Sequence, residues 1–248
     1  MKIISSLDVE SKQEIRRIVD VLAGDERVAG YKIGFVLGLR YGLEEIVDLI
    51  KSRDPDKTIM YDHQKGGTDI PDVGVKFATT LSRAGIDTAI LFPLSGPATL
   101  ASWIDAFNMA NITAIVGGYM THPKFTVGEG GYIADNAATW GIYRDAVNLG
   151  VRSFVMPGNK KEVTQEILMH VSDALLSYRD SDDHLPDGVA DQKLTTVYCP
   201  GFKFQGGNIQ EMDEIFGNKN IQWYPIVGRA IYQADNPRKA VDELLGNG

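Results

Sequence analysis

Short apolar runs alternate with longer segments of helical periodicity along the whole chain. The runs are rich in Val, Ile, Thr and Tyr and are bounded by polar or glycine-containing turns, a pattern typical of buried strands. They predict eight strands, at residues 2–8, 28–34, 58–62, 88–92, 112–117, 152–156, 194–199 and 222–227.

The segments between these strands carry apolar residues at the spacing of one helix face. In residues 12–22, for example, Ile15, Ile18, Val19 and Leu22 fall on one side of a helix. The same periodicity predicts helices at residues 43–50, 73–84, 98–110, 137–149, 161–176 and 237–245. Alternating strands and helices favour parallel pairing, and eight such repeats predict an α/β fold, a closed (β/α)8 TIM barrel.

The chain is expected to form a single domain over residues 1–248, because no Pro/Ser-rich linker or change in composition divides it. Residues 177–193 are the most polar and turn-rich part, and we interpret them as an acidic surface loop between the sixth helix and the seventh strand. A second long loop, residues 121–131, follows the fifth strand and contains several glycines.

Composition argues against several partners and compartments. With 25 Lys and Arg against 33 Asp and Glu, the chain has a formal charge of −8 and no basic field for a nucleic-acid backbone. No window holds the roughly 18 apolar residues of a membrane span, and the N-terminal segment turns polar by Asp8, too early for a secretory signal. Cys199 is the only cysteine, and no histidine pair has metal-ligand spacing, so we expect a cytoplasmic protein without disulfide or metal site.

The loops after the strands carry an unusual concentration of charged and polar residues. In a (β/α)8 barrel the active site lies at the carboxyl ends of the strands, where these loops begin. The residues at those positions are Asp8, Lys32, Asp62, Lys65, Asp69, Ser95, Thr121, His122, Pro157, Gln205 and Arg229. One polar residue at a strand end is ordinary turn chemistry, whereas this set predicts an active site at the barrel mouth.

The segment YDHQKGGTDIP, residues 61–71, places two carboxylates and a lysine directly after a buried strand. Lys32, in YKIG, belongs to the neighbouring strand, and a lysine within an apolar strand needs a charged partner. Alternating lysines and aspartates hold one another charged and form a preorganised electrostatic site that uses no metal. The alternative for any one of these residues is a solvated ion in a surface turn.

Two glycine-containing segments near the end of the sequence indicate a phosphate site. In PIVGRAIYQADNP, residues 225–237, the eighth strand runs into Gly228 and Arg229 and then a short helix, and the guanidinium offers a bidentate contact to an anion. CPGFKFQGG, residues 199–207, follows the seventh strand, and its Gln205 is a candidate for contacting a phosphate or an amide. The alternative for Arg229 is a solvated side chain in a strand-to-helix turn.

Taken together, these motifs resemble the orotidine 5′-phosphate decarboxylase family. SLD, YKIG, the Asp/Lys/Asp-Ile-Pro segment, MTHP, CPGFKFQGG and IVGRAIYQADNP occur in that family's order and cover nearly the whole chain. The resemblance implies a homodimeric (β/α)8 barrel that converts orotidine 5′-monophosphate to UMP and CO2 in pyrimidine biosynthesis. It also implies that neither a metal nor a cofactor takes part.

The resemblance assigns catalysis to four residues. Lys32 matches the first lysine of the family's charged array, and Asp62 matches the aspartate beside the carboxylate that leaves. Lys65 matches the lysine that protonates C6 of the pyrimidine. Asp69 matches the aspartate that one subunit donates across the dimer interface to the site of its partner.

Further matches imply substrate-binding roles. Asp8 resembles the residue that binds the ribose, and Ile70 resembles the apolar residue beside the pyrimidine. Thr121 stands where the family usually has a serine that reads the pyrimidine amide, and it retains the hydroxyl. The remaining implied contacts, mainly to the phosphate, come from Pro200, Gln205, Gly228 and Arg229.

The catalytic segment departs from the family in its spacing. The usual pattern is Asp-x-Lys-x-x-Asp, whereas this chain has Asp62-x-x-Lys65-x-x-x-Asp69, with one extra residue in each gap. Because alternate residues of a strand share a face, we expect a bulge near His63 and Gln64 to restore the direction of Lys65.

Two other functions remain open on the residues alone. A related group of sugar-phosphate decarboxylases and aldolases, resembling 3-keto-gulonate phosphate decarboxylase and hexulose phosphate synthase, shares the Asp/Lys/Asp strand. Its members usually have a glutamate in place of Lys32 and use Mg²⁺, so activity lost to EDTA would indicate this group. A non-catalytic barrel that binds nucleotide phosphates is the second alternative, favoured only by the altered spacing, and UMP binding without CO2 release would indicate it.

Overall fold

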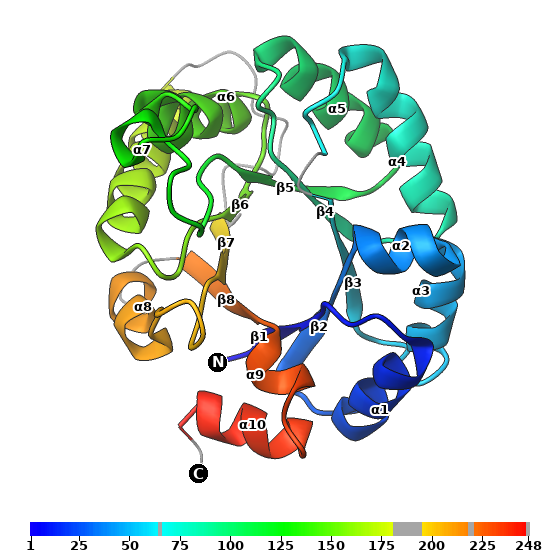
Figure 1. The fold of residues 1–248 in the computed structure, drawn as a ribbon. Coiled ribbons are helices and arrows are strands. Elements are labelled where there is room, and N and C mark those ends of the chain that lie inside the picture. Colours follow the sequence, from blue (N-terminus) through cyan, green and yellow to red (C-terminus); the bar gives the residue numbers. More distant parts are fainter. Residues whose placement is uncertain (64–65, 181–194, 218–220, 247–248) are drawn as a thin grey trace.

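The computed structural model of the protein describes residues 1–63, 66–180, 195–217 and 221–246 (Figure 1). Two predicted features fall at least partly outside these ranges. Lys65 lies outside them altogether, as does all of the 177–193 loop beyond residue 180.

Eight parallel strands close into a barrel in sequence order, and β8 pairs with β1 to complete the ring. The strands surround the centre of Figure 1, and the helices form an outer ring around them. The strands are β1 (Ile3–Leu7), β2 (Val28–Gly34), β3 (Thr58–Asp62), β4 (Thr88–Leu91), β5 (Thr113–Gly117), β6 (Ser153–Val155), β7 (Thr195–Pro200) and β8 (Ile221–Val227). The predicted (β/α)8 barrel is therefore confirmed, with strand bounds within one or two residues of those expected from the sequence.

Helices follow the strands around the outside of the barrel. They are α1 (Lys12–Leu22), α2 (Phe35–Tyr41), α3 (Leu43–Lys51), α4 (Gly74–Arg83), α5 (Pro97–Met109), α6 (Ile142–Asn148), α7 (Lys161–Asp180), α8 (Ile209–Phe216), α9 (Arg229–Tyr232) and α10 (Pro237–Leu244). A 3-10 turn at Pro71–Val73 leads into α4, another lies at Val127–Glu129, and a π-helical turn at Ala137–Gly141 precedes α6. Within the described ranges, no helix is both long and apolar enough to cross a membrane.

Helix α1 shows how the sequence determines the outer layer. Ser11 caps its N-terminus, because the hydroxyl accepts a hydrogen bond from the Glu14 amide at 3.2 Å. The four residues predicted to share a face, Ile15, Ile18, Val19 and Leu22, are all fully buried. The helix is thus held by one apolar stripe against the barrel wall.

Two helices were not predicted from the pattern. In α2 only Leu37 is buried, while Phe35, Val36 and Leu39 are exposed, so the helix has no apolar stripe directed at the core. Helix α8 does carry such a stripe, at Ile209, Met212, Ile215 and Phe216. The predicted helix over residues 137–149 is present but divided, since its first turn is π-helical and only the remainder is α6.

The apolar core has two layers. The larger layer lies between the outer faces of the strands and the surrounding helices. A smaller cluster fills the interior of the barrel, and its members are Ile4, Met60, Ile90, Phe92, Ile115, Val155 and Ile226. This inner cluster closes the barrel from below, so that any cavity at the mouth has an apolar floor.

Ion pairs and hydrogen bonds hold the last helix, α10, against α1 and the turn before β2. Arg27, just before β2, pairs with Asp25 at 2.8 Å and also with Asp242 on α10. Arg238, at the start of α10, donates two hydrogen bonds to the Val21 carbonyl of α1, at 3.0 and 2.7 Å. These contacts hold α10 beside α1, next to the seam where β8 meets β1.

Candidate active site

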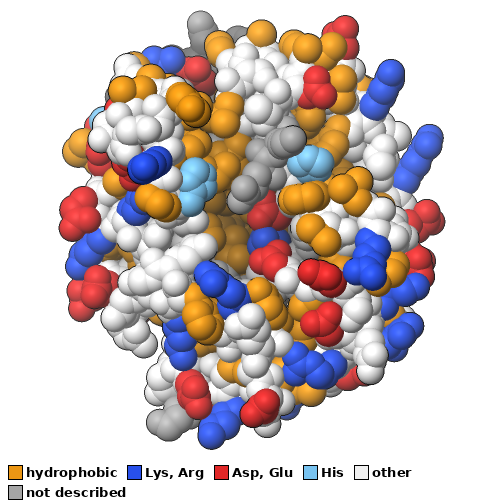
Figure 2. All heavy atoms as spheres, viewed as in Figure 1, with side chains coloured by type: hydrophobic (Ala, Val, Ile, Leu, Met, Phe, Trp, Pro, Cys, Tyr) orange, Lys and Arg blue, Asp and Glu red, His pale blue; other side chains and the backbone are white. Residues whose placement is uncertain are grey.

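The cavity at the carboxyl ends of the strands brings together most of the predicted site residues. Figure 2 shows a hollow at the centre of this face, with apolar atoms inside it and acidic and basic side chains along its wall. The predicted residues that line it are Asp8, Lys32, Asp62, Thr121, Pro200, Gln205, Gly228 and Arg229. They come from six different strands or the loops that follow them, so the closed barrel is what assembles the site.

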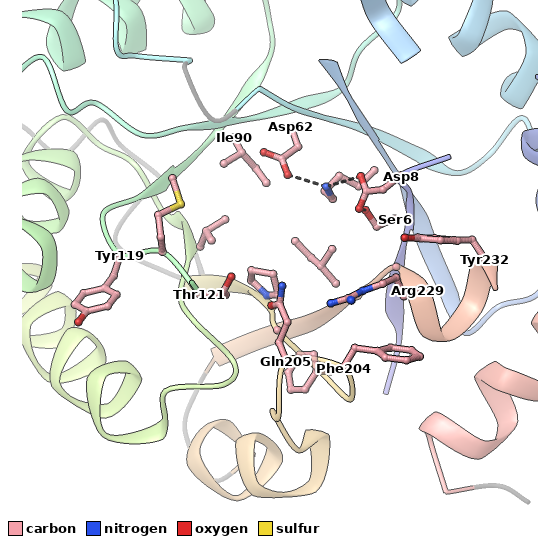
Figure 3. A pocket seen from close by; sticks show the side chains of 18 of the residues that line it. Ser6, Asp8, Asp62, Ile90, Tyr119, Thr121, Phe204, Gln205, Arg229 and Tyr232 are labelled. Carbon is pink, nitrogen blue, oxygen red and sulfur yellow. Dashed lines mark hydrogen bonds and ion pairs between the residues drawn. The ribbon is translucent and has the colours of Figure 1, made fainter. Parts of the chain in front are cut away.

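Lys32 forms the centre of a charged array on one wall. Its Nζ lies 2.7 Å from Asp62 Oδ2 and 3.4 Å from Asp8 Oδ1, the two contacts drawn as dashed lines in Figure 3. The lysine is only 7% exposed. Burial alone would lower the pKa of Lys32, but the charges and hydrogen bonds of Asp62 and Asp8 outweigh it and raise that pKa above its ordinary value. The ammonium therefore stays charged at physiological pH.

Strand register explains why these three side chains meet. Lys32 on β2 lies opposite Ser6 on β1 and Met60 on β3, so all three positions share one level of the barrel. Asp8 and Asp62 each lie two residues further along their strands, on the same face as Ser6 and Met60. Ser6 donates a 2.8 Å hydrogen bond to Asp8 Oδ2 and so orients that carboxylate.

Asp62 has one carboxylate oxygen without a partner. Oδ2 is taken by Lys32, whereas Oδ1 is buried and accepts no hydrogen bond from any described residue. A buried carboxylate oxygen without a donor is costly, and such groups mark places where a ligand or a reacting group is expected. Among the described residues, Asp62 Oδ1 is therefore the position in the array that is open to a further donor.

The far side of the cavity carries uncharged polar groups and a cation. In Figure 3, Thr121, Gln205 and Arg229 point into the cavity from the side away from Asp62, and Arg229 lies on the same side of the cavity as Asp8. The Arg229 guanidinium lies 5.0 Å from the centre of the Phe204 ring and is directed into the cavity (Figure 3), and it forms no ion pair with a described residue. Asp62 therefore lies across the cavity from groups that offer donors to an anion.

Gly228 leaves little room for a side chain where β8 meets Arg229. A Cβ at this position would lie 3.4 Å from Asp8 Oδ2 and from the Ser6 side chain, and 3.3 Å from the ring of Tyr232. Any larger side chain would press on the groups that orient Asp8. The predicted Gly-Arg pair thus joins the charged wall to the wall that carries Arg229.

Asp69 and Ile70 do not line the cavity of their own chain. Both are exposed, Ile70 by 59%, and they lie on the segment between β3 and α4. Their backbone is nevertheless firmly held, because Thr99 Oγ1 donates to the Asp69 carbonyl at 3.0 Å and Trp103 Nε1 donates to the Ile70 carbonyl at 3.2 Å. The side chains are therefore presented outward from a fixed backbone.

The region of the expected bulge is only partly described. β3 ends at Asp62, and the Gly66 amide donates a 2.6 Å hydrogen bond back to the His63 carbonyl, so the chain turns there. Lys65, predicted to be catalytic, and Gln64, predicted to be in the bulge, lie outside the described residues. The side chain of His63 lies among the rings of Phe35, Tyr61 and Phe77 on the outer side of the strand, and it does not line the cavity.

Sequence reasoning missed several residues that line the cavity. Ser6 lies in the SLD motif two residues before Asp8, and the alternation of a strand places both on one face, a signal that the sequence does carry. The apolar floor and the aromatic rim carry no such signal, because their residues look like ordinary core or loop positions. These residues are Ile90, Phe92, Tyr119, Met120, Val155, Phe202, Phe204, Ile226 and Tyr232.

Comparison with known proteins gives a consistent result. The model of the orotidine 5′-phosphate decarboxylase / HUMPS family matches residues 1–244. The orotidine 5′-phosphate decarboxylase of Methanosarcina mazei is 26% identical over 97% of this chain and 92% of its own length. The enzyme of the same name from Methanococcus maripaludis is 28% identical over 97% of this chain and 94% of its own.

Solved structures agree with the sequence matches. The crystal structure of orotidine 5′-monophosphate decarboxylase from Methanocaldococcus jannaschii, complexed with the inhibitor BMP, superposes with a TM-score of 0.76. It is 26% identical in sequence and covers 98% of this chain and 95% of its own. Because the family match spans nearly the whole chain and the fold agrees with it, the chain belongs to the orotidine 5′-phosphate decarboxylase / HUMPS family.

Proposed function

We propose that the protein decarboxylates orotidine 5′-monophosphate to UMP and CO2. The observation that carries this proposal is the buried Lys32 between Asp62 and Asp8, in a cavity that Arg229 also lines. An anionic nucleotide needs a cationic anchor for its phosphate, and the decarboxylation needs a site that disfavours the carboxylate and favours negative charge at C6. The cavity provides groups of both kinds.

The substrate is expected to lie across the cavity. Arg229 and Gln205 would bind the phosphate, and the Thr121 hydroxyl would read the pyrimidine amide. Asp8, held by Ser6, would accept a hydrogen bond from the ribose. This orientation places C6 and its carboxylate near Asp62, because Arg229 and Gln205 lie on the far side of the cavity from Asp62 (Figure 3).

The reaction breaks one bond and forms one. The bond between C6 and the carboxylate cleaves, CO2 leaves, and the electron pair of that bond stays on C6. Asp62 destabilises the bound carboxylate through like-charge repulsion, and Lys32 fixes the position of Asp62 through the 2.7 Å contact. A proton is then transferred to C6, and we assign this step to Lys65, whose ammonium group would favour the developing charge before donating the proton.

The proposal includes a homodimer in which Asp69 and Ile70 complete the site of the partner subunit. Both side chains are turned away from their own cavity on a backbone fastened by Thr99 and Trp103. Exposed apolar residues at the same end of the barrel, such as Phe35 and Leu39 on α2, give this face the character of a subunit interface. Met109, also exposed, lies at the far end of α5 and provides a matched control position.

The central experiment follows the loss of orotate absorbance from orotidine 5′-monophosphate with EDTA present. We expect steady turnover by the wild-type protein, unchanged by the chelator or by added Mg²⁺. Activity that EDTA removes and Mg²⁺ restores would instead support the sugar-phosphate alternative. That outcome is disfavoured by Lys32, whose ammonium occupies the position between the two carboxylates where a divalent cation would bind.

The Lys65→Ala variant tests the proton donor. We expect kcat to fall by about 1000-fold or more while UMP still binds, because a positioned general acid and an electrostatic contact are removed together. Near-normal turnover by this variant would refute the assignment. Binding of UMP by the wild-type protein without any CO2 release would refute decarboxylation and support the non-catalytic alternative.

A further inference from the structure

We propose that Asn159 is a positioning residue that fixes the distance between two loops. One is the loop of residues 121–131, which carries Thr121 and is proposed to contact the base, and the other is the loop of residues 199–207, which carries Gln205 and is proposed to bind the phosphate. The inference rests on the proposed function and deepens it. Asn159 lies between β6 and α7 and does not line the cavity itself. Its side chain instead contacts the backbone of two loops whose side chains do line it.

The amide nitrogen of Asn159 bridges the two loops directly. Nδ2 donates one hydrogen bond to the Thr121 carbonyl at 3.1 Å and another to the Gln205 carbonyl at 3.2 Å. An amide NH2 has two protons, so both carbonyls are satisfied by one group. Because both neighbours are acceptors, the nitrogen and not the oxygen must face them.

The amide oxygen of Asn159, Oδ1, is packed against the loop of residues 199–207. Oδ1 of Asn159 is buried and has no hydrogen-bond partner among the described residues. It lies 3.0 Å from where a Cβ at Gly201 would be, and Gly201 has a φ of +115°, a conformation that favours glycine. The two hydrogen bonds of Nδ2 thus hold the side chain in place even though Oδ1 remains unpaired, which indicates a constraint imposed by the loops.

The next residue strengthens the attachment to the β5 loop. Lys160 Nζ donates to the His122 carbonyl at 3.2 Å, forms an ion pair with Glu129 and lies 4.6 Å from the centre of the Tyr119 ring. Asn159 thus binds the Thr121 carbonyl, and the next residue, Lys160, binds the His122 carbonyl. Lys160 does not touch the 199–207 loop through any of these contacts, and the Gly158 amide, which donates to the Pro200 carbonyl at 2.8 Å, does not touch the 121–131 loop through that bond. Asn159 contacts both loops through one side chain.

The consequence for the reaction follows from where the two loops act. In the proposed complex Thr121 contacts the pyrimidine and Gln205 the phosphate, at the two ends of one substrate. A single side chain bonded to both backbones sets the separation of these contacts before the substrate arrives. Such preorganisation lowers the cost of ordering the site and improves the alignment of the reacting carbon.

The test compares Asn159→Ala and Asn159→Asp with Asn236→Ala. We expect kcat/KM for orotidine 5′-monophosphate to fall about 10- to 100-fold in Asn159→Ala, the effect of two hydrogen bonds. Asn159→Asp should be at least as impaired, because a carboxylate of the same shape repels both carbonyls. Asn236 accepts hydrogen bonds from the Arg238 and Lys239 amides and so caps α10. Asn236→Ala should therefore lower the thermal stability about as much as Asn159→Ala does, but it should leave kcat/KM unchanged.

A mutant cycle separates positioning from a general structural role. The effects of Thr121→Ala and Gln205→Ala on kcat/KM should be strongly coupled when Asn159 is present. In the Asn159→Ala background the two effects on kcat/KM should be additive within about twofold. Unchanged coupling, or a loss of activity in Asn159→Ala no larger than in Asn236→Ala, overturns the inference. Wild-type protein that fails to decarboxylate the substrate overturns the proposed function instead, and the two failures are therefore distinguishable.

Discussion

At the scale of single residues, Lys32 shows most clearly what a sequence can and cannot reveal. A lysine inside an apolar strand requires a charged partner, and the structure places two of them, Asp62 and Asp8, within 3.4 Å. The sequence therefore predicted that the array exists. It could not predict that one Asp62 oxygen would be left buried and unpaired, because that depends on side-chain directions at the barrel mouth.

The Lys32→Met variant tests how strongly this residue supports the fold as well as the site. Removing the cation leaves two carboxylates facing one another, so we expect the free energy of unfolding to fall by about 3 kcal/mol and turnover to be lost. Urea denaturation measures the first effect and the absorbance assay the second. Lys239→Met is the control, because Lys239 pairs with Glu243 on the exposed face of α10 and should change stability by about 0.5 kcal/mol or less. Equal effects of the two substitutions would contradict the interpretation of the array.

At the scale of elements, the apolar pattern explains the prediction of α1 and the failure to predict α2, whereas α8 carries an apolar stripe that the sequence analysis overlooked. Helix α1 has a cap and a complete stripe, and its predicted bounds match the structure. Helix α2 has neither an apolar stripe nor a side-chain cap, since most of its apolar residues face outward, so periodicity alone could not reveal it. Periodicity gives no role to Ile70 either, because an exposed apolar residue after a buried strand does not indicate which surface it contacts, and its role came only from the family resemblance.

The pair of Asp25 and Arg27, in the turn before β2, makes stability sensitive to acid. Hydrogen bonds and charge from Arg27 hold the pKa of Asp25 at about 2, below its ordinary 3.8, and outweigh the opposing effect of burial. A lowered pKa stabilises the folded state above pH 4, and the contribution, about 2 kcal/mol, is lost as the pH falls from about 4 to about 2. Urea denaturation across this range should show a weaker pH dependence for Asp25→Asn than for the wild-type protein. Parallel curves would show that Asp25 does not contribute this linkage.

At the scale of the whole molecule, the closed barrel explains why a site built from distant residues was predictable at all. Parallel strands deliver their carboxyl ends to one rim, so residues from position 8 to position 229 meet there once the fold is known. The proposed homodimer does not follow from the strand pattern. It rests on the family resemblance, which matches Asp69 to a residue donated across the interface, and on the exposure of Asp69 and Ile70 in the structure.

Subunit mixing provides a test of the proposed homodimer. Lys65→Ala and Asp69→Ala should each be nearly inactive alone, because every site in either dimer lacks one essential group. In a mixture, each mixed dimer has one complete site, so activity should rise to about a quarter of the wild-type value after subunit exchange. No recovery after verified exchange would show that Asp69 does not act across an interface. Ile70→Lys should shift sedimentation toward the monomer, whereas Met109→Lys should not.

The burial of Cys199 on β7 gives the molecule an internal reporter. It is the only thiol in the chain, it is fully buried, and burial raises its pKa, so alkylating reagents reach it only when this part of the barrel opens. The next residue, Pro200, lines the cavity, so opening that exposes the thiol should also disrupt the nucleotide site. UMP at 100 times its dissociation constant should therefore slow alkylation about 100-fold. Labelling at the same rate with and without UMP would mean that the strand opens while the binding pocket stays intact.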